Sequence, residues 1–275
     1  MATQPINLST ESDPIWQDIR AETACMVKDE PVLASFVHST ILNHQSLESA
    51  LSFHLAHKLD SPTASALLIR EVIEQALSSD PSIGKAVRCD LRAVRERDSA
   101  CNSYAVPFLY FKGFHALQAY RVAHWLWQQG REALALFLQN CISTEFAVDI
   151  HPAATMGHGI LMDHATGVVI GETTVVGNNV SIMQGVTLGG TGKEEGDRHP
   201  KIGDGVLIST GATILGNIKI GCGAKVGAGS VVLQDVPPHT TVAGVPAKEV
   251  GHPATDQPAL DMNHGISCDM DSCTD

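Results

Sequence analysis

The chain has 275 residues, of which 44% are hydrophobic, and its 18 basic and 30 acidic residues give a formal net charge of −12. This length allows one large domain or two moderate ones, each with a sizeable core. The acidic balance argues against nucleic acid and anionic membrane as partners, because both attract clusters of Lys and Arg. No apolar run reaches the roughly 18 residues that a membrane-spanning helix needs.

The beginning of the chain, MATQPINLSTESDPIW, contains no basic segment followed by an apolar one. A secretory signal is therefore not expected, and a cytoplasmic location is favoured. The seven cysteines show no paired CxxC spacing, which agrees with reduced thiols in that compartment.

The first half of the chain, residues 1–145, shows a pattern typical of helices. A capping residue followed by proline favours a helix start, and four such pairs occur, at Asp13-Pro14, Glu30-Pro31, Ser61-Pro62 and Asp80-Pro81. The segment ALLIREVIEQAL, residues 66–77, repeats apolar side chains at helical spacing. Six or seven helices are therefore predicted in a helical N-terminal domain.

The second half changes abruptly in composition, since 20 of the 24 glycines lie between residues 150 and 251. An aliphatic residue recurs there at every sixth position, a period that fits neither a helix nor a simple alternating strand. A six-residue period is the signature of a parallel β-helix. We therefore predict a β-helix domain over residues 146–250 and, from its polar and acidic composition, a disordered tail over 251–275. The clearest run is Ile202, Ile208, Ile214, Ile220, Val226 and Val232.

The six-residue register is interrupted twice. The step from Met162 to Ile170 is eight residues, and the step from Leu188 to Ile202 is fourteen and contains GGTGKEEGDRHPK. Extra residues leave a solenoid as loops, often on the binding face. Any chemistry is therefore predicted at 163–169 and 189–201.

Four histidines cluster in the first part of the predicted solenoid or in its loop: His151, His158, His164 and His199. Histidine exchanges protons near neutral pH. Asp149 precedes His164 by fifteen residues, close to one coil, so its carboxylate could orient the imidazole. The residues alone leave two alternatives open: hydrogen-bonded structural histidines at β-helix corners, and a zinc site built from the first three histidines.

The motifs VDIHPAA, DHATGVVIGET, QGVTLGGTGKEEGDRHPKIGDGV and AGVPAK follow a helical half that contains YFKGFHALQAYRVAHWLW. In this order and spacing they closely resemble the bacterial serine acetyltransferases of the hexapeptide-repeat acyltransferase superfamily, over about residues 13–250. The resemblance implies an α+β chain with a left-handed parallel β-helix and a helical domain that joins two trimers into a hexamer. It also implies acetyl transfer from acetyl-CoA to the L-serine hydroxyl, which gives O-acetylserine for cysteine synthesis.

The resemblance further implies roles for single residues. His164 corresponds to the general base and Asp149 to its carboxylate partner, and a base is needed because a hydroxyl is a poor nucleophile. Asp98 and Asp163 correspond to groups that bind the substrate ammonium by charge-assisted hydrogen bonds. Direct transfer of this kind needs no metal.

Further positions carry over in the same way. Arg198 and His199 correspond to residues that hold the substrate carboxylate, His199 with an additional acid–base role. Glu172 either supports the site from behind or forms a turn. CoA is expected along the solenoid, near Gly190, Thr210 and Lys248.

The resemblance also implies partners. Cysteine is expected as a feedback inhibitor in the serine site. Many family members end in an isoleucine that inserts into the active site of O-acetylserine sulfhydrylase. Because this sequence ends in Asp275, weak or absent complex formation is expected.

Three other functions remain as alternatives. A β-helix zinc enzyme of the carbonic anhydrase type would use the three clustered histidines, but it leaves the loop at 189–201 unexplained. An acetyltransferase for another small acceptor would share the same chemistry. A catalytically silent scaffold is the third, since a repeat fold does not by itself imply a function.

Overall fold

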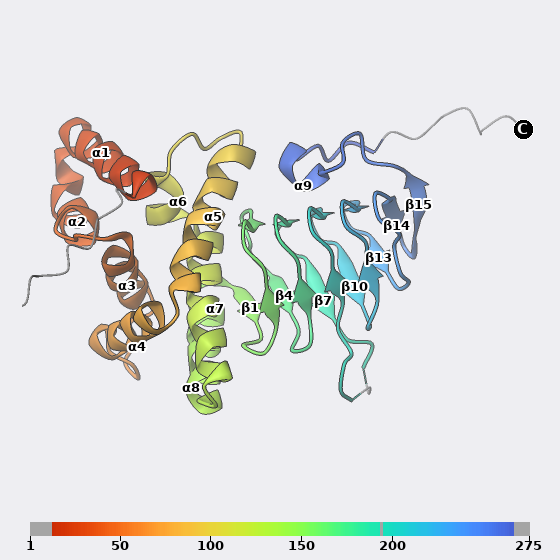
Figure 1. Ribbon diagram of the computed structural model, residues 1–275, viewed down its shortest axis with the longest axis horizontal. Helices are drawn as coiled ribbons and strands as arrows, with labels where there is room; N and C mark the ends of the chain where they lie inside the picture. Colours follow the sequence, from red (N-terminus) through yellow and green to blue (C-terminus); the bar gives the residue numbers. More distant parts are fainter. Residues whose placement is uncertain (1–12, 193–194, 267–275) are drawn as a thin grey trace, which may run out of the picture.

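The computed structural model describes residues 13–192 and 195–266 (Figure 1). Helices occupy the chain as far as Phe146, and short parallel strands follow from Val148. The predicted order of a helical part and a parallel β-helix is confirmed. Within the described residues, no helix combines the length and the apolar character that crossing a membrane requires.

The helical part contains eight α-helices and two short turns of other helix types within the described residues. Two predicted starts are confirmed, because the side chains of Asp13 and Asp80 each accept a hydrogen bond from a backbone N–H of the first turn. The α-helices are α1 (Pro14–Asp29), α2 (Ala34–Val37), α3 (Leu47–Lys58), α4 (Ala66–Ser79), α5 (Pro81–Arg97), α6 (Ala105–Tyr110), α7 (Lys112–Gln128) and α8 (Glu132–Phe146), and the other turns are η1 (Pro31–Leu33) and η2 (His38–Leu42).

The start predicted at Ser61-Pro62 is wrong. Ser61 and Ala64 close a tight turn through mutual backbone hydrogen bonds, and α4 begins only after Ser65. The carboxylate of Asp60 accepts from the backbone N–H of Ala66 at 2.7 Å. Asp60 therefore supplies the capping oxygen that the sequence pattern assigned to Ser61.

The helical part is fixed to the first coil of the solenoid by buried polar groups. Helix α7 packs against β3, and α8 packs against β1. Asp90 of α5 is fully buried and accepts from Arg121 Nη2 at 2.6 Å and from the backbone N–H of Ile160 at 2.9 Å. Arg121 also donates to Gly157 O at 2.9 Å. One buried ion pair thus joins two helices to the solenoid.

The solenoid has three faces built from short parallel strands that successive coils contribute, and only β15 pairs in the antiparallel direction among the described strands. The first face has the order β1-β4-β7-β10-β13, the second β11-β8-β5-β2, and the third β15-β14-β12-β9-β6-β3. We call the first face sheet B. The strands are β1 (Val148–Ile150), β2 (Thr155–Met156), β3 (Leu161–Met162), β4 (Val168–Ile170), β5 (Val175–Val176), β6 (Ser181–Ile182), β7 (Thr187–Gly189), β8 (Lys201–Ile202), β9 (Leu207–Ile208), β10 (Thr213–Leu215), β11 (Lys219–Ile220), β12 (Lys225–Val226), β13 (Val231–Val232), β14 (Thr241–Gly244) and β15 (Ala247–Gly251).

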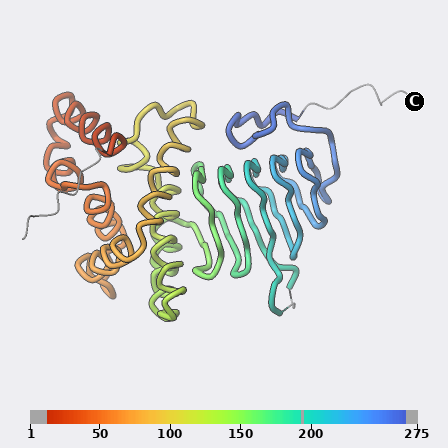
Figure 2. The backbone as a smooth tube through the Cα atoms, viewed as in Figure 1, coloured from red at the N-terminus to blue at the C-terminus, as the bar shows by residue number. Residues whose placement is uncertain are grey.

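The six-residue series forms the core of this solenoid, as predicted. On sheet B the side-chain positions of Ile150, Ile170, Leu188, Ile214 and Val232 stack in register from coil to coil, and all five are buried. The backbone in Figure 2 shows the coils lying side by side, with the later coils farther from the helices.

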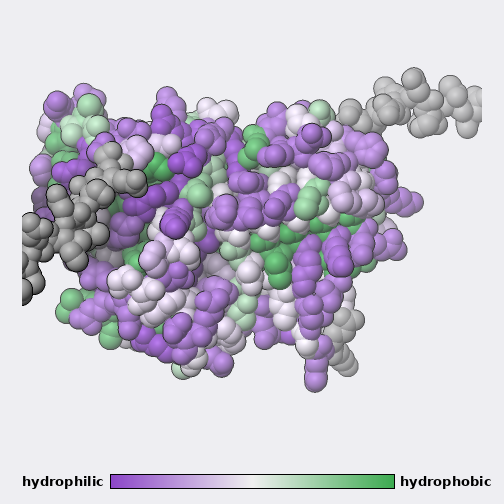
Figure 3. Space-filling model, viewed as in Figure 1, coloured by the Kyte–Doolittle hydropathy of each residue, from purple (hydrophilic) through white to green (hydrophobic). Residues whose placement is uncertain are grey.

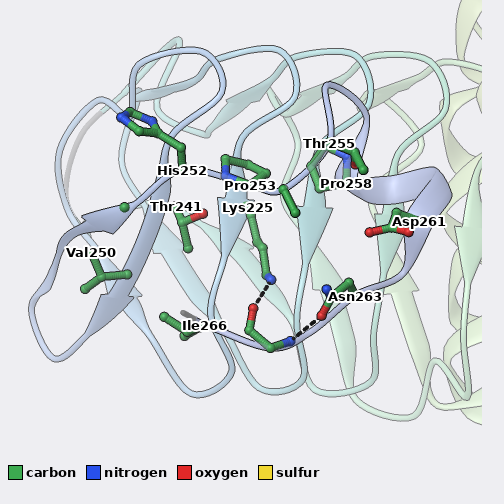
Figure 4. Close-up of a pocket in the computed structure, with 13 residues that line it drawn as sticks. Lys225, Thr241, Val250, His252, Pro253, Thr255, Pro258, Asp261, Asn263 and Ile266 are labelled. Atoms are coloured by element: carbon green, nitrogen blue, oxygen red, sulfur yellow. Dashed lines mark hydrogen bonds between the residues drawn. The ribbon is translucent and has the colours of Figure 1, made fainter. Parts of the chain in front are cut away.

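Residues 252–266 differ from the predicted disordered tail. They run back across the solenoid toward the helices (Figure 2), and α9 (Pro258–Asp261) contacts α5 and β9. Ser181 Oγ donates to Ala259 O at 2.8 Å, and Lys225 Nζ donates to Gly265 O at 2.5 Å (Figure 4). The sequence analysis missed an apolar residue of this segment, Met262, which packs against Val94, Cys101 and Leu161. Residues 267–275, including the terminal Asp275, lie outside the described residues.

Candidate active site

The eight-residue step in the register forms the corner between β3 and β4, residues 163–167, which we call the catalytic corner. His164 and Ala165 are consecutive non-glycine residues with φ of 55° and 59°. The equivalent corners of the later coils carry a glycine in this conformation, Gly185, Gly211 and Gly229, with φ of 71°, 68° and 65°. Left-handed backbone is unfavourable for residues with a Cβ atom, and such strain is concentrated at functional sites.

The catalytic corner lines a cavity of about 440 Å³ between the helical part and the solenoid. His164 projects its side chain from the corner with 71% exposure, and its Nε2 lies 3.8 Å from Asp163 Oδ2. Asp98 enters from the end of α5 and lines the same cavity. The structure therefore brings together three of the predicted residues: Asp98, Asp163 and His164.

Asp149 lies elsewhere on the first coil. It is in β1, where it is in register with Val169, and its Oδ1 accepts from Gln139 Nε2 at 2.6 Å. The first coil takes 20 residues, from Val148 to Val168, so the fifteen-residue spacing does not place Asp149 directly beneath His164. Among the described residues, no hydrogen bond or ion pair joins the two side chains.

A second group of polar residues lies at the corner between β4 and β5 and along the loop before β8. We call this group, Glu172, Thr173, Asp197, Arg198, His199 and Lys201, the arginine cluster. Arg198 Nη2 donates to Glu172 Oε2 at 2.6 Å, and this hydrogen bond holds the pKa of Glu172 below its ordinary value. Lys201 Nζ donates to Asp197 Oδ1 at 2.5 Å. Of the two roles left open for Glu172, the ion pair favours support of the site.

His199 is held as a neutral imidazole within this cluster. The backbone N–H of Thr173 donates to His199 Nδ1 at 3.2 Å, so Nδ1 is an acceptor and the ring proton resides on Nε2. The residue is only 7% exposed, and this burial lowers the pKa of His199. Its ring lies against Gly171 and close to Gly190. His199 is thus arranged to donate a hydrogen bond from Nε2.

The two groups stand at opposite ends of the strands of sheet B. The catalytic corner precedes β4 and the arginine cluster follows it. Arg198 and His199 do not line the cavity that contains His164. The structure thus divides the predicted substrate-binding residues into two halves on one chain.

The residues predicted near CoA are also divided. Gly190 lies beside the arginine cluster. A Cβ atom built on Gly190 would be 3.7 Å from His199 Nε2. Thr210 is at the same edge of sheet B as the catalytic corner, and its carbonyl accepts from Gly229 N. Lys248 is in β15 and lines a cavity of about 540 Å³ at the far end of the solenoid.

The three histidines considered as zinc ligands do not converge. The ring of His151 packs edge-on against Trp127, and its Nδ1 accepts from the backbone N–H of Ala153. His164 lies in the cavity described above. No group of three or more His, Cys, Asp or Glu residues suited to a metal ion occurs in the part of the chain that the structure describes. This geometry gives the zinc alternative no support.

Two side chains of these sites were not predicted from the sequence. Thr173 Oγ1 accepts from the backbone N–H groups of both Arg198 and His199, at 3.0 and 3.1 Å, and so holds the loop against the coil. Lys112 lines the cavity of the catalytic corner. Both belong to motifs already noted, IGET and YFKG, but their side chains carried no chemical signal of their own.

A coiled core with a six-residue period, interrupted to expose a histidine and an arginine cluster, defines a transferase of the hexapeptide-repeat class. The model of bacterial hexapeptide transferases matches residues 199–234, and the model of the serine acetyltransferase N-terminal region matches residues 15–119. The chain is 60% identical over 253 residues to the serine acetyltransferase of Escherichia coli, covering 92% of this chain and 93% of that protein. It belongs to the serine acetyltransferase family.

Solved structures agree with this assignment. The serine acetyltransferase of Vibrio cholerae superposes with a TM-score of 0.91 at 60% identity, covering 92% of this chain and 98% of that chain. A soybean serine acetyltransferase complexed with serine has a TM-score of 0.84 at 63% identity and covers 86% and 97%. A Brucella abortus serine acetyltransferase in complex with coenzyme A has a TM-score of 0.86 at 52% identity and covers 88% and 96%. A serine acetyltransferase complexed with cysteine has a TM-score of 0.90 at 57% identity and covers 92% and 98%.

Proposed function

We propose that this chain transfers the acetyl group of acetyl-CoA to the hydroxyl of L-serine, with His164 as the general base. The observation that carries the proposal is the catalytic corner, where strained backbone presents an exposed imidazole to a cavity between two carboxylates. Acetyl-CoA is the co-substrate. The relatives solved with serine and with coenzyme A support these two ligands.

The cavity suits an amino acid by charge. Asp98 and Asp163 both line it, and two carboxylates favour a substrate ammonium through charge-assisted hydrogen bonds. Serine held by its ammonium would direct its short side chain toward His164. Because Asp98 comes from the helical part and Asp163 from the solenoid, the cavity exists only while the two parts stay packed together.

The reaction requires one proton transfer in each direction. His164 removes the hydroxyl proton as the serine oxygen attacks the thioester carbonyl carbon. The tetrahedral oxyanion then expels the CoA sulfur as the C–S bond breaks. The imidazolium returns its proton to the departing thiolate, which leaves O-acetyl-L-serine and CoA. Asp163 Oδ2 lies 3.8 Å from His164 Nε2, and Asp149 remains the predicted partner of the base.

A second copy of the chain is proposed to complete this site. The arginine cluster offers a neutral His199 donor and the Arg198 guanidinium for the substrate carboxylate, but it lies across sheet B from His164. In a ring of three copies, the cluster of one chain can face the catalytic corner of the next. Figure 3 shows apolar side chains gathered on the front face of the solenoid, and Val169 of sheet B is 41% exposed. A trimer, and two trimers joined as a hexamer, are the proposed assembly.

The reaction is tested by following release of the CoA thiol from acetyl-CoA with serine, threonine, homoserine or no acceptor. We expect serine to support release. We expect His164→Ala to lower kcat by at least about 100-fold, which is the usual contribution of a general base to the rate. Near-full kcat in His164→Ala would refute the role of the base. Faster release with threonine or homoserine would instead favour another small acceptor.

The shared site is tested by co-expressing His164→Ala chains with Arg198→Ala chains. Neither variant forms an intact site alone. In randomly mixed trimers, a site takes its histidine from one chain and its arginine from the next, so about one site in four is intact. Activity near a quarter of wild type supports the shared site. Activity no higher than that of the separate variants would show that each chain forms its own site.

Two further proposals follow from the same cavity and family. L-Cysteine differs from L-serine by a thiol in place of the hydroxyl, so we propose it as an inhibitor that competes with serine, in line with the relative solved with cysteine. Competitive inhibition against serine in the CoA-release assay is the expected result. A cytoplasmic location stays a prediction from the sequence.

A further inference from the structure

The first turn of α7 lies directly against the catalytic corner. A Cβ atom built on Gly113 would be 2.1 Å from Met162 O and 2.9 Å from the Ala165 side chain. No other residue type fits this contact without displacing the backbone of the corner. The helix therefore abuts Met162 and Ala165, which lie on either side of His164 in the sequence.

Lys112 extends this contact to a further residue of the corner, Thr166. Its Nζ donates to Thr166 Oγ1. Thr166 in turn donates its backbone N–H to His164 O at 2.8 Å, and its carbonyl accepts from Gly185 N of the next coil at 2.9 Å. Thr166 thus connects the histidine, the second coil and the lysine of α7.

Within the part of the chain that the structure describes, the ammonium of Lys112 has no carboxylate partner. Among the described residues, no Asp or Glu oxygen lies within ion-pair distance of it. A lysine that served only to stabilise the surface would gain more from a carboxylate than from a hydroxyl. Lys112, which lines the same cavity as His164, instead donates to a threonine two residues after that histidine.

We propose that Lys112 is a positioning residue for acetyl transfer, which holds Thr166 and thereby the left-handed backbone that presents His164 to the substrate. The conformation of His164 and Ala165 is unfavourable in isolation and persists only if surrounding contacts fix it. Gly113 restrains the corner at Met162 and Ala165, and the hydrogen bond from Lys112 restrains it at Thr166. This inference rests on the proposed role of His164 as the base.

The role predicts a particular kinetic pattern. Lys112→Met keeps the length of the side chain but removes the donor. We expect kcat to fall by on the order of 10- to 100-fold, since a displacement of about 1 Å in a reacting group has effects of this size. The KM values for serine and acetyl-CoA and the midpoint of unfolding should change little. Lys112→Arg, which can still donate to the threonine, should retain most of kcat.

A double-mutant cycle with Thr166→Val separates this role from a purely structural one. Thr166→Val should lower kcat to a similar extent, and the double variant should be no worse than either single variant, because both remove the same hydrogen bond. Lys85→Met, at an exposed lysine of α5, is the matched control and should behave as wild type.

Three results would overturn the inference. Additive losses in the double variant would show that Lys112 acts independently of Thr166. A raised KM for serine with unchanged kcat would make Lys112 a ligand of the substrate itself. Wild-type kcat in Lys112→Met would show that the corner needs no such restraint. These outcomes are distinct from failure of the proposed function, in which the wild-type protein would release no CoA with serine.

Discussion

Replacement of Gly171 by alanine tests the placement of His199. Gly171 follows β4, and the imidazole of His199 lies flat against it. A Cβ built on Gly171 would be 2.1 Å from His199 Cδ2 and 2.2 Å from Nε2. Gly171 is not one of the glycines with positive φ, so alanine can adopt its backbone conformation. The substitution therefore acts through this contact and not through backbone strain.

The size of the effect follows from the distances. Restoring an ordinary contact of 3.4 Å from 2.1 Å requires the ring to move by about 1.3 Å. His199 Nδ1 is 3.2 Å from Thr173 N and 2.9 Å from Thr173 Oγ1, so this movement breaks both hydrogen bonds. One lost hydrogen bond costs about 1 kcal/mol and overpacking about 1–3 kcal/mol. With two hydrogen bonds lost, we expect Gly171→Ala to lower the free energy of unfolding by roughly 3–5 kcal/mol.

The catalytic effect is measured by CoA release at varied serine concentration. A donor displaced by about 1 Å should lower kcat/KM for serine by on the order of 10- to 100-fold. Gly84→Ala is the control, because its Cβ would meet only the side-chain ends of Glu48 and Arg88 and alanine favours a helix by about 1 kcal/mol over glycine. Wild-type kcat/KM in Gly171→Ala would refute the argument that the ring of His199 must lie where it does.

Two other predictions concern stability. Asp90→Ala leaves the guanidinium of Arg121 buried without its counterion, and the free energy of unfolding should fall by about 3–5 kcal/mol in denaturant titration, with a smaller loss for Asp90→Asn, whose amide oxygen still accepts. Burial lowers the pKa of His54 to about 4 and that of His115 to about 3, from an ordinary 6.5. The unfolded chain therefore binds more protons below pH 6.5, and stability present above that pH is lost as the pH falls toward 4 and then 3, by up to about 1.4 kcal/mol per pH unit for each group. His115→Gln, which keeps an N–H donor but does not titrate, should make this pH dependence shallower, and an unchanged slope would contradict the assignment.

The fold of the second half was predictable because one residue in six must enter a narrow core. Every coil repeats the same requirement, so Ile202 to Val232 carried the register without a break, and the two irregular steps marked loops. The course of residues 252–266 was not predictable in the same way. Its anchors, Ala259 and Met262, are isolated apolar residues in a polar segment, and their partners lie far away in sequence on α5 and the solenoid.

The site was predicted in its composition but not in its geometry. The resemblance named Asp98, Asp163 and His164, and the structure brings these three together. The fifteen-residue spacing does not place Asp149 directly beneath His164, because a regular coil takes 18 residues and the first coil takes 20; its role as partner of the base stays a prediction. Lys112 was missed, since nothing in a helix-initiating lysine reveals which distant hydroxyl it will reach.

The way the two ends of the solenoid are covered limits how copies of this chain can associate. A stack of parallel coils exposes backbone N–H and C=O groups at its terminal coils, and an open edge of this kind can recruit another chain indefinitely. Here α8 packs against β1 at one end. At the other end, β15 pairs with β14 in the antiparallel direction, which breaks the register that a further coil would have to continue. These contacts hinder the stacking of a further coil on the faces that they cover at each end of the solenoid.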